Sequence, residues 1–165
     1  AFVDETIRMW RHLWSGRTDP FHGEFFDIND FVFKPLPPQG ENLPIWTGGR
    51  SERALRRAVE LADGYHAART GPDDVRVKRD AMARISESIG GEVPVISVRA
   101  RVRFDEAPSD VYTMCGTDSD VAGEVARFAE VGTEHLIVVL EETAPERIRL
   151  VAERFHQQAV VPALG

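Results

Sequence analysis

After Pro44, short apolar runs alternate with segments in which apolar residues recur every three or four positions. Short apolar runs are typical of buried strands, and the longer period is typical of helices packed on one side. The pattern predicts strands at residues 45–47, 65–68, 93–104 and 134–140. A predicted helix follows each strand, at residues 51–62, 73–89, 118–131 and from 145 onward. Strands and helices that alternate in this way indicate a parallel sheet with right-handed crossovers.

The last of these units has the clearest boundaries. The run from Leu136 to Leu140 is continuously apolar, as expected for a strand covered on both faces. Residues 143–146, Thr-Ala-Pro-Glu, form a capping-box pattern with proline in the first turn of the final helix. The apolar residues predicted to face inward on that helix are Ile148, Val151, Ala152 and Phe155.

The segment before Pro44 follows a different pattern. Residues 2–15 have helical spacing, with Trp10 and Trp14 one turn apart as predicted core anchors. Residues 17–43 are rich in proline, glycine and phenylalanine, and they predict short extended pieces at 23–28 and 31–34. Such a long excursion is either a binding loop or a loop that only covers the core. The chain is thus expected to be one partial domain, residues 1–165, with a helix at 1–16, an insertion at 17–43 and four βα units at 44–165.

Composition excludes several classes of function. The chain has 165 residues and a formal net charge of −7, which disfavours a nucleic-acid or anionic-membrane surface. No apolar run is long enough to span a bilayer. The single cysteine, Cys115, cannot form an internal disulfide, which fits a reducing compartment such as the cytoplasm. His22 has no second ligand at a suitable spacing, so no metal site is expected.

The strongest candidate for chemistry is the stretch of residues 44–51, Pro-Ile-Trp-Thr-Gly-Gly-Arg-Ser. It predicts a strand, a tight turn and the start of a helix. Backbone N–H groups at a helix start have no intrahelical partner, and glycine allows a ligand to approach the backbone closely. The turn therefore suits a phosphate, although an ordinary strand-to-helix turn has the same local sequence.

Four stretches in this order resemble the luciferase-like monooxygenase family. They are residues 21–26, Phe-His-Gly-Glu-Phe-Phe; 35–39, Pro-Leu-Pro-Pro-Gln; 44–49, Pro-Ile-Trp-Thr-Gly-Gly; and 62–65, Ala-Asp-Gly-Tyr. Residues 4–7, 13–16 and 115–117 add to the resemblance, which is greatest to the branch that depends on the deazaflavin coenzyme F-420.

This resemblance implies an α/β fold: the C-terminal half of a (β/α)8 TIM barrel, with about four βα units, a preceding helix and an extended insertion. It implies an oxidoreductase that uses coenzyme F-420 or FMN for hydride transfer or monooxygenation of a small organic substrate. It places the coenzyme phosphate at Thr47, Gly48, Gly49, Arg50 and Ser51. His66 and Arg69 would lie near the ring or the substrate. The catalytic residue is not identified, because the resemblance places the acid–base histidine in the first half of the barrel.

Two other interpretations remain open. The chain is alternatively a non-catalytic half-barrel that folds by oligomerisation, as a dimer or with a missing N-terminal half, and keeps at most an anion-binding turn. A third interpretation is an unrelated small α/β phosphate binder with a complete open sheet. Arg99, Arg101 and Arg103 alternate along one predicted strand, which is unusual for a packed barrel interior. They are expected at the rim, exposed to solvent.

Overall fold

The computed structural model describes residues 1–107 and 111–165. Its strands are β1 (Phe21–His22), β2 (Asp27–Ile28), β3 (Trp46–Gly48), β4 (Gly64–Ala68), β5 (Val95–Phe104), β6 (Thr113–Gly116) and β7 (His135–Leu140). Its α-helices are α1 (Phe2–Trp14), α2 (Glu52–Leu61), α3 (Pro72–Ile89), α4 (Asp118–Glu130), α5 (Pro145–Phe155) and α6 (Val161–Leu164). Short helical turns η1 (Gly40–Asn42) and η2 (His156–Val160) complete the description.

Five parallel strands form the main sheet, with β5 at its centre. Strands β3 and β4 pair on one side of β5, and β7 pairs on the other side. The far end of β5 also pairs with β6, where Arg101 lies opposite Thr113. The predicted alternation of strands and helices is confirmed, and β6 is a short additional strand that the sequence pattern does not predict.

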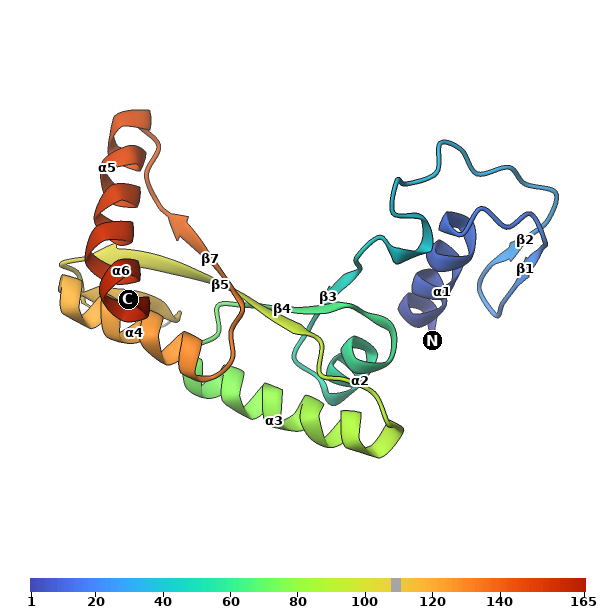
Figure 1. Cartoon of the computed structure of the whole chain (residues 1–165), viewed down its shortest axis with the longest axis horizontal. Helices are drawn as coiled ribbons and strands as arrows, with labels where there is room; N and C mark the ends of the chain where they lie inside the picture. Colours follow the sequence, from blue (N-terminus) through green and yellow to red (C-terminus); the bar gives the residue numbers. More distant parts are fainter. Residues whose placement is uncertain (108–110) are drawn as a thin grey trace.

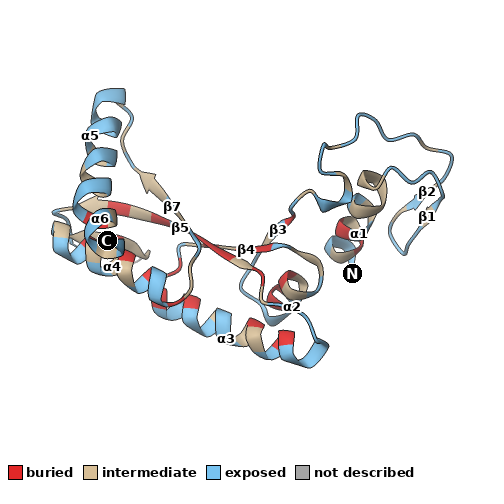
Figure 2. Cartoon of the chain, viewed as in Figure 1, coloured by how far each residue is buried: buried red, intermediate tan, exposed pale blue. Residues whose placement is uncertain are grey.

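The two faces of the sheet differ sharply. Helices α2, α3 and α4 lie on one face, and the buried residues of the chain concentrate between them and strands β4 and β5 (Figures 1 and 2). The other face is open and lies between α5 at one end and α1 with the insertion at the other (Figure 1). We call it the concave face. Strand alternation places Trp46, His66, Ser97, Arg99 and Ile137 on it.

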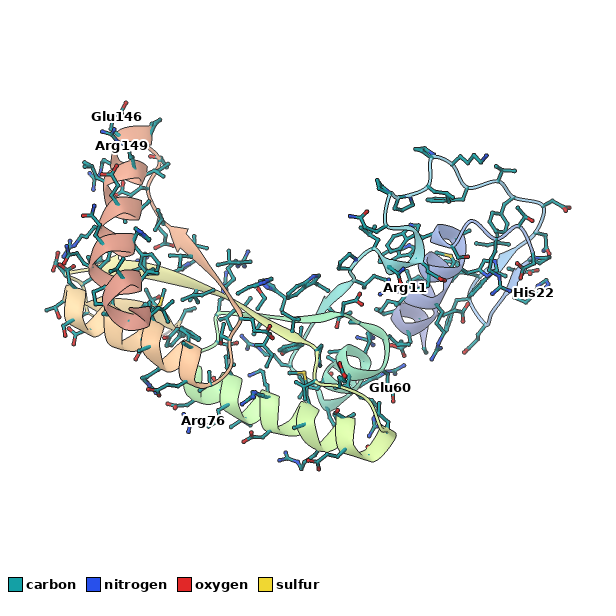
Figure 3. The ribbon with its side chains drawn as sticks, viewed as in Figure 1. Arg11, His22, Glu60, Arg76, Glu146 and Arg149 are labelled. Atoms are coloured by element: carbon teal, nitrogen blue, oxygen red, sulfur yellow. The ribbon has the colours of Figure 1, made fainter. Side chains whose placement is uncertain are left out.

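Polar contacts join helix α1 to the insertion and to the start of β3. The Glu5 carboxylate accepts hydrogen bonds from the backbone N–H groups of Glu24, Phe25 and Phe26 at 2.8–2.9 Å. Arg11 of α1, labelled in Figure 3, donates to the carbonyl oxygen of Leu43 at 2.8 Å and pairs with Asp63. The Asp63 carboxylate also accepts the backbone N–H of Ile45 at 2.7 Å, so one carboxylate connects α1 to the start of β3.

Two sequence-based expectations about packing are wrong. Trp10 stacks on Trp14 with ring centroids 5.8 Å apart but is 40% exposed, so it is not a core anchor. Ile148 is exposed as well, and no residue of α5 is fully buried. Of the two predicted extended pieces, residues 23–28 include β2, which pairs with β1 across a tight hairpin, and residues 31–34 belong to no strand.

The expectation for the three arginines is only partly correct. Arg99 lies opposite Ala68, within the sheet rather than beyond it. Arg101 and Arg103 extend past the end of β4, but both form ion pairs with Glu141 rather than lying free in solvent. Within residues 1–107 and 111–165, no helix is both long and apolar enough to cross a membrane.

Candidate functional site

The candidate site lies where β3 and β4 end at their carboxyl termini. The two strands are parallel neighbours, with Gly48 opposite His66, so the segments that follow them emerge at the same edge of the sheet. In parallel α/β folds, ligands bind at this edge. Residues 48–51 therefore lie at the same edge as Arg69 and Thr70, and they are four of the five residues predicted to bind the coenzyme phosphate.

The turn after β3 requires both of its glycines. A Cβ at Gly48 would lie 2.8 Å from the carbonyl oxygen of His66. Gly49 has a φ of +127°, and a Cβ there would lie 2.7 Å from the Ala54 side chain. Any larger residue would force the turn away from β4. The turn is thus held at a close approach to its neighbouring strand.

The turn also presents free hydrogen-bond donors. Within the part of the chain that the structure describes, the backbone N–H groups of Arg50 and Ser51 have no acceptor, whereas the parallel ladder between β3 and β4 uses the N–H of Gly49. The Ser51 hydroxyl caps α2, since its oxygen accepts from the N–H of Ala54 at 3.3 Å. Unpaired N–H groups at the start of a helix suit an anionic group, and Arg50 and Ser51 fit a phosphate on this ground.

Thr47 differs from its neighbours in the turn. Strand alternation places its side chain on the helix side, and its buried Oγ1 has no hydrogen-bond partner among the described residues. The hydroxyl therefore does not reach the open edge, and the backbone of Thr47 is engaged in the ladder with β4, so Thr47 is not placed to bind the phosphate.

A pocket of about 570 Å³ adjoins the turn. Arg50, Arg69 and Lys78 line it with positive charge, and Asp74 is its acidic member. Arg69 holds a left-handed φ of 55°, which is uncommon for a residue with a side chain. Its own N–H donates to the carbonyl oxygen of Arg99 at 3.1 Å, so β5 supports this conformation. The family resemblance assigned Arg50 to the coenzyme phosphate and Arg69 to the ring or the substrate, but both side chains line this one pocket.

His66 lies on the concave face of β4, two residues before the strand ends at Ala68. Its Nδ1 lies 3.1 Å from the hydroxyl of Ser97, which is buried on β5. Burial, and then the positive charge of Arg99, lower the pKa of His66 below its ordinary value. The imidazole is therefore neutral at neutral pH.

Three residues of this region escape sequence reasoning. Tyr65 faces the helices but reaches the turn with its hydroxyl, and burial raises its pKa. Lys78 belongs to α3, far from any motif, and reaches the pocket only through the fold. Ser97 could have been identified from the sequence, because it is a polar residue within the otherwise apolar start of β5.

The sequence profile of luciferase-like monooxygenases matches residues 1–112. An uncharacterized protein of Mycobacterium tuberculosis is 37% identical over 82% of this chain and 51% of its own length. The FMNH(2)-dependent dimethylsulfone monooxygenase of Pseudomonas putida is 29% identical over 60% of this chain and 27% of its own length. The chain thus spans about half the length, or less, of these relatives.

Solved structures show the same fold at low identity. The coenzyme F-420-dependent tetrahydromethanopterin reductase of Methanopyrus kandleri has a TM-score of 0.76 and 13% identity, over 96% of this chain and 63% of its own. The oxygenating part of 3,6-diketocamphane monooxygenase from Pseudomonas putida, in complex with FMN, has a TM-score of 0.73 and 13% identity. The match covers 98% of this chain and 63% of that protein's chain. These comparisons confirm that the four βα units form half of a TIM-barrel fold. Because the family profile covers more than half of the sequence, the chain belongs to the luciferase-like monooxygenase family.

Proposed function

We propose that this chain forms the coenzyme-binding half of an oxidoreductase that uses reduced FMN or coenzyme F-420. When bound, that coenzyme supplies the hydride transfer or monooxygenation of a small organic substrate. Family membership supports the reaction class, and the relatives' dependence on FMN or coenzyme F-420 supports both coenzymes. The chain's own contribution is to hold the coenzyme's phosphate and to orient its ring over the concave face.

One observation carries the proposal. The unpaired N–H groups of Arg50 and Ser51 open at the same edge as the pocket lined by Arg50, Arg69 and Lys78. Backbone donors give an anion a fixed position, and the cationic side chains add charge-assisted hydrogen bonds. His66 is the register partner of Gly48, the first glycine of the turn, and we assign it to the ring side of the bound coenzyme.

The test compares ligands that differ only in the phosphate. FMN and riboflavin share the ring, so fluorescence titration of the chain with each measures the contribution of the phosphate; coenzyme F-420 is titrated in parallel. We expect the chain to bind FMN or F-420 more tightly than riboflavin. The double variant R50Q/K78Q should remove this preference for the phosphate.

Arg76→Gln is the matched control, because Arg76 lies on the same helix as Lys78 and points away from the sheet (Figure 3). It removes one positive charge without touching the pocket, so the preference for FMN should survive. Equal affinity for FMN and riboflavin in the wild-type chain would contradict the proposal. So would an R76Q variant that loses the preference as fully as R50Q/K78Q.

A second candidate function rests on the open concave face. Trp46 is 38% exposed and Ile137 is 49% exposed there, although both belong to the main sheet. Large apolar side chains on an uncovered sheet favour association with another protein surface. The chain would then act as a non-catalytic module that assembles through this face. Light scattering distinguishes the two functions: a monomer that binds FMN supports the enzyme, and a dimer without affinity for FMN supports the module.

A further inference from the structure

A second group of polar residues lies on the concave face, inward from the phosphate turn. His66 and Ser97 are opposite each other on β4 and β5, and Arg99 is the next residue of β5 on the same face. Three neighbouring positions on one side of the sheet therefore carry an imidazole, a hydroxyl and a guanidinium. None of them belongs to the pocket lined by Arg50, Arg69 and Lys78.

The Ser97 hydroxyl determines which nitrogen of His66 carries the proton. Ser97 is 2% exposed, and among the described residues its hydroxyl contacts only Nδ1 of His66. A buried O–H without an acceptor is costly, so the hydroxyl donates to Nδ1. A neutral imidazole that accepts at Nδ1 carries its proton on Nε2. His66 therefore presents a hydrogen-bond donor, not an acceptor, through Nε2.

Arg99 is the unpaired member of the arginine series on β5. Arg101 donates from Nε to Glu141 at 3.0 Å, and Arg103 donates to the same carboxylate at 2.7 Å. Across residues 1–107 and 111–165, the Arg99 side chain has no ion pair or hydrogen bond, and the residue is exposed. Its cross-strand neighbours on this face are Ala68 and Ile137, which offer it no acceptor. A cation flanked by small and apolar side chains lacks a counterion within the fold.

We propose that His66, Ser97 and Arg99 form a subsite for the anionic group, a carboxylate or a sulfonate, of a small organic substrate. Arg99 supplies the charge and a two-pronged donor, and the Nε2–H of His66 supplies a third donor. Ser97 is a positioning residue that fixes the imidazole tautomer. The subsite rests on the proposed function, since it names the class of substrate that would lie beside the coenzyme ring. Arg99 suits a planar carboxylate because its guanidinium donates two parallel hydrogen bonds.

The test is an anion titration of the ¹⁵N-labelled full chain, followed by NMR at the Arg99 Nε–H and the imidazole of His66. Acetate and methanesulfonate are the probes, and each replaces chloride at constant ionic strength. We expect saturable shifts at both side chains in the wild-type chain. In Arg99→Gln the apparent Kd, followed at His66, should rise by about tenfold or more, because the charge and its paired donors are lost.

Arg101→Gln is the matched control, since Arg101 lies on the same strand and face but is already paired with Glu141. It should keep the wild-type Kd. Shifts that grow linearly without saturating would overturn the subsite. So would an apparent Kd that rises equally in R99Q and R101Q. Circular dichroism of each variant establishes that it is folded.

The tautomer is tested on the same sample without any ligand. The ¹⁵N shifts of the imidazole should show the Nε2–H form in the wild-type chain and a mixture of forms in Ser97→Ala. An Nδ1–H form in the wild-type chain would overturn the role of Ser97. Failure of this subsite is distinguishable from failure of the phosphate site. The variant R99Q should keep the preference for FMN over riboflavin. The variant R50Q/K78Q should keep the NMR response to acetate.

Discussion

The hydroxyl of Tyr65 donates a hydrogen bond of 2.5 Å to the carbonyl oxygen of Gly49. Tyr65 is 1% exposed and lies in the core beneath the sheet, whereas Gly49 lies at the open edge. One buried side chain therefore connects the core to the turn that carries the unpaired N–H groups. The geometry of the anion site depends on core packing as well as on the glycines themselves.

Removing this hydroxyl should loosen the turn. Tyr65→Phe keeps the ring and its packing but loses the bond to Gly49, which costs about 0.5–1.5 kcal/mol of unfolding free energy. The apparent affinity for FMN should fall, because the turn that carries the N–H groups of Arg50 and Ser51 is no longer held in place. Urea unfolding followed by tryptophan fluorescence measures the first effect and FMN titration the second. An unchanged FMN affinity in a folded Y65F chain would show that the turn is not held through Tyr65.

The first glycine of the turn should be intolerant of any side chain. Gly48→Ala places a methyl group 2.8 Å from the backbone oxygen of His66, so strands β3 and β4 must move apart. Overpacking of this kind typically costs about 1–3 kcal/mol. Gly123→Ala on α4 is the matched control, since nothing lies within 4 Å of a Cβ there. In a helix that change should stabilise the chain by about 0.5–1 kcal/mol. Equal urea midpoints for the two variants would contradict the packing at Gly48.

The insertion should detach from α1 when Glu5 loses its charge. Burial alone would raise the pKa of Glu5, but the N–H groups of Phe25, Phe26 and Glu24 outweigh it and lower the pKa below its ordinary value. The carboxylate is thus protonated more easily in the unfolded chain. Its contribution to stability is complete above the ordinary glutamate pKa and is lost as the pH falls through the lowered folded-state pKa.

Glu5→Gln tests this directly. Near neutral pH the variant should unfold at lower urea than the wild-type chain, because an amide oxygen accepts these bonds more weakly than a carboxylate. The difference between the two midpoints should shrink as the pH falls toward the lowered pKa. A difference that stays constant over that range would exclude the carboxylate as its source.

Much of the fold could be predicted from the sequence because its signals are local. Apolar runs located the strands, and Gly48-Gly49 located the turn, since both depend on residues adjacent in the chain. The assignment to half of a barrel came from the order of motifs, and the structural relatives confirm it. The short strand β6 was not predicted because its sequence, Thr-Met-Cys-Gly, contains no continuous apolar run.

The site was less predictable because its contacts cross between elements. The sequence pattern around Tyr65 is that of an ordinary core residue. Only the pairing of β3 with β4 brings its hydroxyl to Gly49. Lys78 lies on α3 and has no neighbour in sequence that marks a ligand. The difference between Arg99 and Arg101 is invisible in a repeated arginine pattern, because it depends on where Glu141 lies in space.

The central claim is that the turn after β3 binds the phosphate of the coenzyme. The most direct measurement is a comparison of ¹⁵N amide spectra of the chain on addition of FMN and of riboflavin. FMN, and not riboflavin, should produce large saturable shifts at the N–H groups of Arg50 and Ser51. Shifts of equal size with both ligands, or FMN shifts confined to residues away from this turn, would contradict this claim.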